Sequence, residues 1–128
     1  MADKSALSKY KQTSVTTASR GKLLLMLYES CIKNCRLAIE ATKARKLNDK
    51  GIYILKVQDI INELSLSLNH EIGGELSKEL ERLYNFMIAK ITEANANNDP
   101  KPLEVTLSLL EKLYQGWVGA VNQVEKNG

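Results

Sequence analysis

Two cysteines and one histidine are the most reactive side chains of this 128-residue chain. Cys31 and Cys35 are four residues apart, so on a helix they share one face, one turn apart. Their Cβ atoms then point the same way, which is poor disulfide geometry. His70 is the only His, and no further Cys could complete a tetrahedral zinc site. We therefore expect both thiols to be small buried side chains in a reducing compartment.

The remaining polar residues form no catalytic or cofactor-binding motif that we recognise. His70 is predicted to lie in a turn as an exposed polar residue, and the sequence has no paired Glu-x-x-His motifs of the kind that bind two irons in helical bundles. Gly73-Gly74 lacks a following Lys-Ser/Thr, and no strand is predicted before it, so it is no phosphate loop. The sequence therefore predicts no enzyme, no metal site and no cofactor.

The charge of the chain is uneven, although its net value is only +3. Residues 1–50 hold 11 basic and 4 acidic side chains, whereas residues 51–128 hold 7 basic and 11 acidic ones. A basic half can contact nucleic acid or acidic lipid. Because these cations are scattered rather than clustered, we favour a solvated surface and no nucleic-acid partner, with weak nucleic-acid binding kept as an alternative.

The hydrophobic runs are short. The longest, residues 23–28, is far below the roughly 20 apolar residues that cross a bilayer. The N-terminus has no apolar stretch typical of a signal peptide. We expect a cytoplasmic protein without membrane insertion.

Four helices must position these residues, because apolar side chains recur with helical spacing along most of the chain. Residues 1–19 are rich in Ser, Thr and Lys and are expected to be a flexible arm. The bundle domain is predicted over residues 20–126, with its first helix capped by Ser19 and ending near Lys46, and with a turn at 48–51. The second helix covers about 50–69 and is stopped by the glycines at 73–74, the third runs from Glu75 to 95–98, and the fourth begins at Asp99-Pro100. Short connections make neighbouring helices antiparallel, so the fold class is all-α, an up-down-up-down four-helix bundle.

The second and fourth predicted helices carry more apolar residues than one core-facing stripe requires. The surplus predicts either tight packing, a groove that receives an amphipathic partner helix, or a bundle that oligomerises. Leu7 and Tyr10 on the arm could cover such a groove in the free protein.

Several short stretches resemble the flagellar export chaperone family FliS, in the order and spacing of that family. They are Tyr10-Lys11-Gln12, Thr17-Ala18-Ser19, residues 21–29, 58–64, 71–76, 83–87 and 93–95, and Leu109-Leu110 followed by Trp117. Two positions depart from the family pattern: Arg20 stands where a Pro is common, and Ser30 stands where an acid is common.

The resemblance implies a small cytoplasmic four-helix bundle, monomeric or weakly dimeric, that binds the disordered C-terminal segment of flagellin in apolar grooves. Such a chaperone prevents premature polymerisation and assists delivery to an export-gate protein of the flagellar type III system. An anti-sigma factor or a flagellin-translation regulator is a further partner of some relatives. A helical adaptor for another amphipathic segment is the alternative.

We expect the flagellin-binding surface on the arm and on the first two helices, with the fourth helix adding contacts. Tyr10 would be the anchor of the arm, and Asp59 and Asn62 would supply polar contacts. Leu27 and Leu64 suit the core equally well, and Tyr84, Met87 and Trp117 suit it better. The predicted site residues are Leu7, Tyr10, Leu23, Leu24, Leu27, Val57, Asp59, Ile60, Ile61, Asn62 and Leu64.

Overall fold

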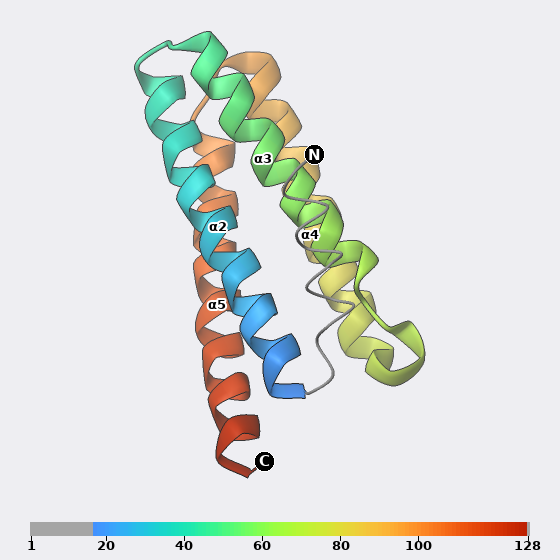
Figure 1. Ribbon diagram of the computed structural model, residues 1–128. Helices are drawn as coiled ribbons and strands as arrows, with labels where there is room; N and C mark the ends of the chain where they lie inside the picture. The colour runs from blue at the N-terminus through green and yellow to red at the C-terminus, as the bar shows by residue number, and fades with distance from the viewer. Residues whose placement is uncertain (1–16, 128) are drawn as a thin grey trace.

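Four antiparallel helices form the part of the chain that the computed structural model describes, residues 17–127 (Figure 1). They are α2 (Thr17–Lys43), α3 (Leu47–Leu66), α4 (His70–Asn97) and α5 (Lys101–Asn127). Each helix packs on its neighbours in the sequence, and α5 returns to pack on α2. The predicted all-α, up-down-up-down bundle is therefore confirmed. None of the helices described is long and apolar enough to cross a membrane.

The start of the bundle lies close to the expected one. Helix α2 begins at Thr17, two residues before the predicted cap at Ser19. The predicted arm residues Leu7 and Tyr10 lie outside the described residues.

The turn between α2 and α3 lies earlier than the sequence indicates. The chain reverses at 44–46, where Arg45 has a positive φ of 56° and its N–H donates to the carbonyl of Thr42. The predicted turn at 48–51 is wrong, because these residues form the first turn of α3. The reason is a tertiary contact: the Lys50 ammonium is buried and donates to the carbonyl oxygen of Asn95, 3.2 Å away, and to the side chain of Asn98.

Between α3 and α4, the glycine pair interrupts a helix, but a different one from that predicted. Helix α3 ends at Leu66, and Asn69 caps α4 by accepting from the N–H groups of Glu71 and Ile72, each at 3.1 Å. Gly74 then breaks α4 after its first turn, with φ 52° and ψ −123°, a conformation that only glycine adopts easily. The expectation that residues 70–74 stop the second helix is therefore wrong. The cap at Asn69 had already begun a new helix.

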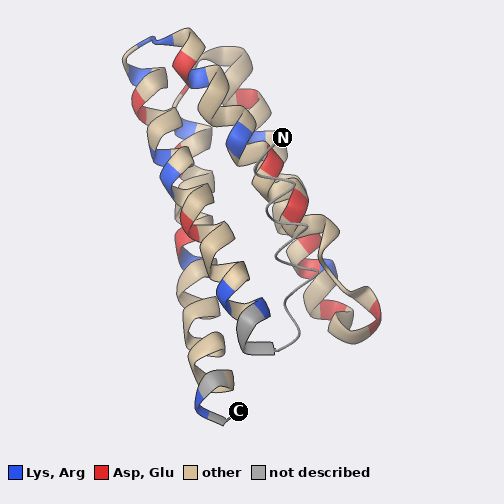
Figure 2. Cartoon of the chain, in the orientation of Figure 1, with Lys and Arg blue, Asp and Glu red and all other residues tan. Residues whose placement is uncertain are grey.

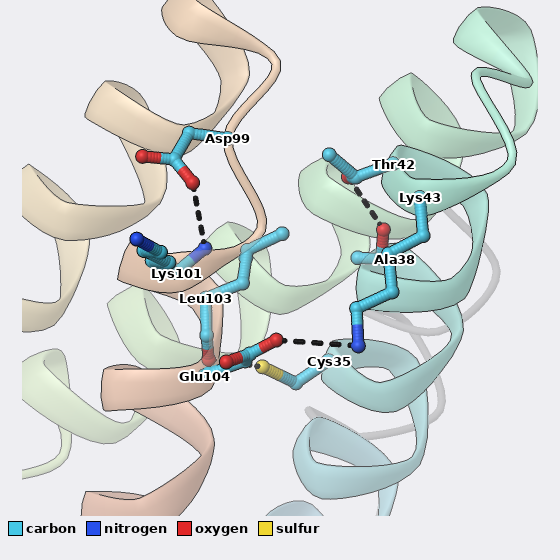
Figure 3. Close-up of polar contacts among 8 residues, drawn as sticks. All are labelled: Cys35, Ala38, Thr42, Lys43, Asp99, Lys101, Leu103 and Glu104. Atoms are coloured by element: carbon cyan, nitrogen blue, oxygen red, sulfur yellow. Dashed lines mark hydrogen bonds and ion pairs between the residues drawn. The ribbon is translucent and has the colours of Figure 1, made fainter.

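The connection from α4 to α5 agrees with the sequence prediction. Asn98 ends α4 in the left-handed conformation, and its N–H donates to the carbonyl of Ala94. The Asp99 carboxylate then accepts from the N–H of Lys101 at 3.0 Å and caps α5 (Figure 3). Pro102 lies in the first turn of α5, where its missing N–H costs no helical hydrogen bond.

The core runs along the whole bundle and receives side chains from all four helices. As predicted, Tyr84 and Met87 belong to it, whereas Trp117 is only partly buried at its margin. The fully buried side chains with the largest volumes are Tyr28, Tyr84, Ile61, Leu64, Met87, Ile91, Leu103 and Leu110.

Candidate binding surface on helices α2, α3 and α5

The two cysteines are inert members of the core, as expected. Both thiols are free and buried, and the Cys35 thiol donates to the carbonyl of Leu103 at 3.5 Å (Figure 3). Burial raises the pKa of Cys35 to about 12, with the charge of Glu111 adding to the effect. Burial raises the pKa of Cys31 as well, and the neighbouring Cys35 raises it further. Neither thiol supplies a nucleophilic thiolate at neutral pH.

The other residues with reactive side chains lie apart from one another. His70 is exposed at the start of α4 rather than in a turn, with its Nε2 3.2 Å from a carboxylate oxygen of Glu81. Over residues 17–127, no group of three or more His, Cys, Asp and Glu side chains is placed to hold a metal ion. The described part of the chain thus presents surfaces rather than a catalytic centre.

Basic side chains of α2 are spread along the helix, and several pair with acids (Figure 2). Arg36 contacts the Glu111 carboxylate at 2.7 Å, and Lys43 contacts Glu104 at 3.3 Å. Both pairs join α2 to α5 on the outside of the bundle. The basic excess of the first half is therefore partly neutralised by α5.

Five of the predicted site residues lie inside the bundle. Val57 and Ile61 are 0% exposed and Leu64 is 1% exposed, while Leu23 and Leu27 are each 7% exposed. Their stripes face the neighbouring helices, so these side chains are not available on the free surface. The expectation that they line an open groove is corrected in this respect.

The other predicted residues within the described range reach the surface at two separate places. Asp59 and Asn62 are exposed on α3, with Ile60 half-buried beside them. Leu24 is half-buried near the start of α2 and lines a pocket with residues of α5. No α3 residue is among the described residues that line this pocket, so the two places are distinct.

Helix α3 carries a second apolar stripe, which faces solvent. Ile52, Leu55 and Leu66 are 54%, 58% and 81% exposed. Together with Asp59 and Asn62 they follow a 3-4-3-4 spacing, which places all five on the face opposite the core. We call these five residues the outer stripe of α3. Its spacing was visible in the sequence, but the stronger core stripe of the same helix concealed it.

The pocket lies where α2 begins and α5 ends, at the end of the bundle where this helix pair diverges from α3 and α4 (Figure 1). Its volume is about 250 Å³. The lining side chains are mainly apolar, from Leu24, Trp117, Ala120, Val121 and Val124, with Arg20 as the charged member. We call it the end pocket.

Comparison with known proteins assigns this architecture to a family. A family model described as "Flagellar protein FliS" matches residues 3–124. The flagellar secretion chaperone FliS of Bacillus subtilis (strain 168) is 34% identical over 127 residues, which are 99% of this chain and 94% of the relative. The flagellar secretion chaperone FliSB of Pseudomonas aeruginosa is 36% identical, over 89% of this chain and 94% of the relative. A bacterial flagellar chaperone of known crystal structure superimposes with a TM-score of 0.77 at 28% identity, covering 94% of this chain and 98% of the other.

The fold and these relatives together define a small helical-bundle secretion chaperone. The chain belongs to the FliS family. Because these relatives are chaperones rather than enzymes, this membership confirms the prediction that the protein is not an enzyme.

Proposed function

We propose that this protein binds the disordered C-terminal segment of flagellin in the cytoplasm, keeps it from polymerising early and assists its delivery to the export gate. The observation that carries the proposal is the membership of a family of flagellar secretion chaperones. A secretion chaperone needs a secreted flagellar client, and flagellin is the client that the sequence resemblance implies. An anti-sigma factor or a translation regulator remains a further partner that the resemblance implies.

The exposed apolar side chains support a surface for an amphipathic segment. A disordered client that becomes helical can lay its apolar face over the outer stripe of α3. Asp59 and Asn62 lie between Leu55 and Leu66 in this stripe, so they can fix the register of the client by hydrogen bonds. The end pocket offers a second apolar contact, which includes the predicted residue Leu24.

The buried members of the predicted site have a supporting role in this proposal. Val57, Ile61 and Leu64 hold α3 on the core and so keep the outer stripe in place. Leu23 and Leu27 do the same for the first turns of α2. Direct contact with the client is proposed for Leu24, Asp59, Ile60 and Asn62, and for Leu7 and Tyr10, which lie outside the described residues.

A polymerisation assay tests the proposal. Flagellin monomers are seeded with short filaments, and elongation is followed by light scattering with and without the full chain. We expect elongation to stop at about one chain per flagellin, because the covered C-terminal segment cannot join a filament. As a control, flagellin lacking its C-terminal segment should not compete for the chain. Undiminished elongation at an excess of folded chain would contradict the proposal.

A further inference from the structure

The end pocket contains a feature that the family pattern does not explain. Arg20, which stands where the family commonly has Pro, is the one charged side chain among the described residues that line it. Arg20 is exposed, and no carboxylate of the described residues pairs with it. A guanidinium at the edge of an apolar pocket is therefore available for an anionic group.

The shape of the pocket depends on a close approach of α2 and α5. A Cβ added to Gly21 would lie 2.9 Å from Cγ2 of Val121, so only glycine allows the two helices to come this near. The pocket that remains, about 250 Å³, is bounded on one side by the partly buried Trp117. Since an apolar cavity of about 150 Å³ holds benzene, this volume admits one side chain the size of Leu, Met or Phe.

We propose that the end pocket binds the C-terminal residue region of the client, with one apolar side chain in the pocket and the terminal α-carboxylate on the Arg20 guanidinium. This proposal rests on the proposed function, because it specifies which end of flagellin the site receives. The planar guanidinium matches a carboxylate with two parallel N–H donors. The pocket thus combines one apolar contact with one charge-assisted contact.

A chain end suits this pocket better than an internal segment does. An internal residue brings peptide groups on both sides, and each buried N–H or carbonyl without a partner is costly. Apart from Arg20, the lining side chains offer almost no exposed polar atom, since the Trp117 indole nitrogen is itself buried. A terminal residue brings a carboxylate that Arg20 can bind in place of a continuing chain.

Two forms of one peptide test this proposal. The full chain is titrated with the last forty or so residues of flagellin, carrying either a free C-terminal carboxylate or a C-terminal amide. We expect the free acid to bind about five- to tenfold more tightly, as expected for a partly exposed charge-assisted contact. In Arg20→Gln both forms should bind with the same, weaker affinity. Arg82→Gln, which removes an exposed guanidinium from α4, is the matched control and should keep the preference.

The outcomes separate this proposal from the function on which it rests. Equal binding of both peptides to the unmodified chain, or a preference that survives in Arg20→Gln, would overturn it while leaving flagellin binding intact. An equal gain in affinity for both peptides in Arg20→Gln would show that residues 1–16 of the chain itself cover the pocket, and would also overturn it. If neither peptide binds to the folded chain, the proposed function itself is wrong.

A second variant tests the apolar contact separately. Ala120 is exposed beside the pocket, so Ala120→Leu fills the pocket without changing the core. We expect it to weaken both peptides by about tenfold, an effect of the size of losing one buried apolar side chain. Unchanged affinity for both peptides in this variant would exclude an apolar side chain of the client from the pocket.

Discussion

The hydroxyl oxygens of Tyr28 and Tyr84 lie 2.6 Å apart in the middle of the core. Tyr28 comes from α2 and Tyr84 from α4, which are diagonally opposite in the bundle, so this hydrogen bond joins the two helices that share the smallest contact. Both side chains are almost completely buried, at 0% and 2% exposure. Each hydroxyl therefore depends on the other for its hydrogen bond.

Removal of one hydroxyl should cost more than half of what removing both costs. Tyr84→Phe leaves the Tyr28 hydroxyl buried without its partner, and we expect a loss of about 1–3 kcal/mol in the free energy of unfolding. Tyr28→Phe should behave in the same way. In the double variant the two costs should fall short of their sum, because no orphaned hydroxyl remains. Urea unfolding of the three variants measures this, and strictly additive losses would show that the two hydroxyls are not coupled.

The buried thiols and phenols make the stability of the bundle sensitive to alkaline pH. Burial raises the pKa of Tyr28, Tyr84, Cys31 and Cys35 in the folded state above their values in the unfolded chain. The stabilisation from these raised pKa values is fully present below the unfolded pKa values and is lost as the pH rises through and above them. Each group that is ionised only in the unfolded chain lowers stability by about 1.4 kcal/mol per pH unit.

We therefore expect the free energy of unfolding to fall from about pH 9 upward, and more steeply above pH 10, where the phenols join the thiols. Denaturant unfolding under reducing conditions between pH 7 and 10.5 measures the slope. Replacement of both cysteines by Ala should delay the onset of the fall by about one pH unit. A stability that stays constant to pH 10.5 would mean that these groups are accessible to water in the folded protein.

Lys50 ties the start of α3 to the end of α4. Its ammonium donates to the carbonyl of Asn95 and to the side chain of Asn98, and it is 6% exposed. We expect Lys50→Met to lower the free energy of unfolding by about 1–3 kcal/mol, because two buried acceptors lose a charged donor. Lys56→Met, at an exposed position of the same helix, should change it by less than about 0.5 kcal/mol. Equal effects of the two substitutions would show that the tie contributes nothing specific.

The sequence predicts this bundle well where local signals decide the structure. The apolar spacing of each helix and the Asp99-Pro100 start of α5 are local, and the structure agrees with them. The turn after α2 fails because Lys50 makes its decisive contact with Asn95, 45 residues away. A local reading sees Asn48, Asp49 and Gly51 as turn residues and cannot detect that contact.

The candidate site was harder to predict for a related reason. Helical spacing places Ile61 and Leu55 on two different faces of α3, but it does not say which face the other helices cover. The more regular stripe, with Ile61, was taken for the groove and is the core, while the outer stripe is the exposed one. Only the packing of α2 and α4 on α3 decides between the two.

This difference gives a direct comparison between core and surface. Leu55→Glu, on the outer stripe, should leave the helical circular dichroism and the unfolding midpoint nearly unchanged and weaken flagellin-peptide binding by about five- to twentyfold. Ile61→Glu should instead unfold or strongly destabilise the bundle, because it buries an unpaired charge. A Leu55→Glu variant that binds flagellin with full affinity would exclude the outer stripe from the binding surface.

The central claim is that the bundle folds the C-terminal segment of flagellin on its surface. Calorimetric titration of the full chain with a peptide of the last forty or so flagellin residues, repeated at several temperatures, tests it most directly. We predict saturable one-to-one binding, a negative change in heat capacity from apolar burial and a gain of helical signal on mixing. Absence of binding, with the bundle shown to be folded under the same conditions, would contradict the claim.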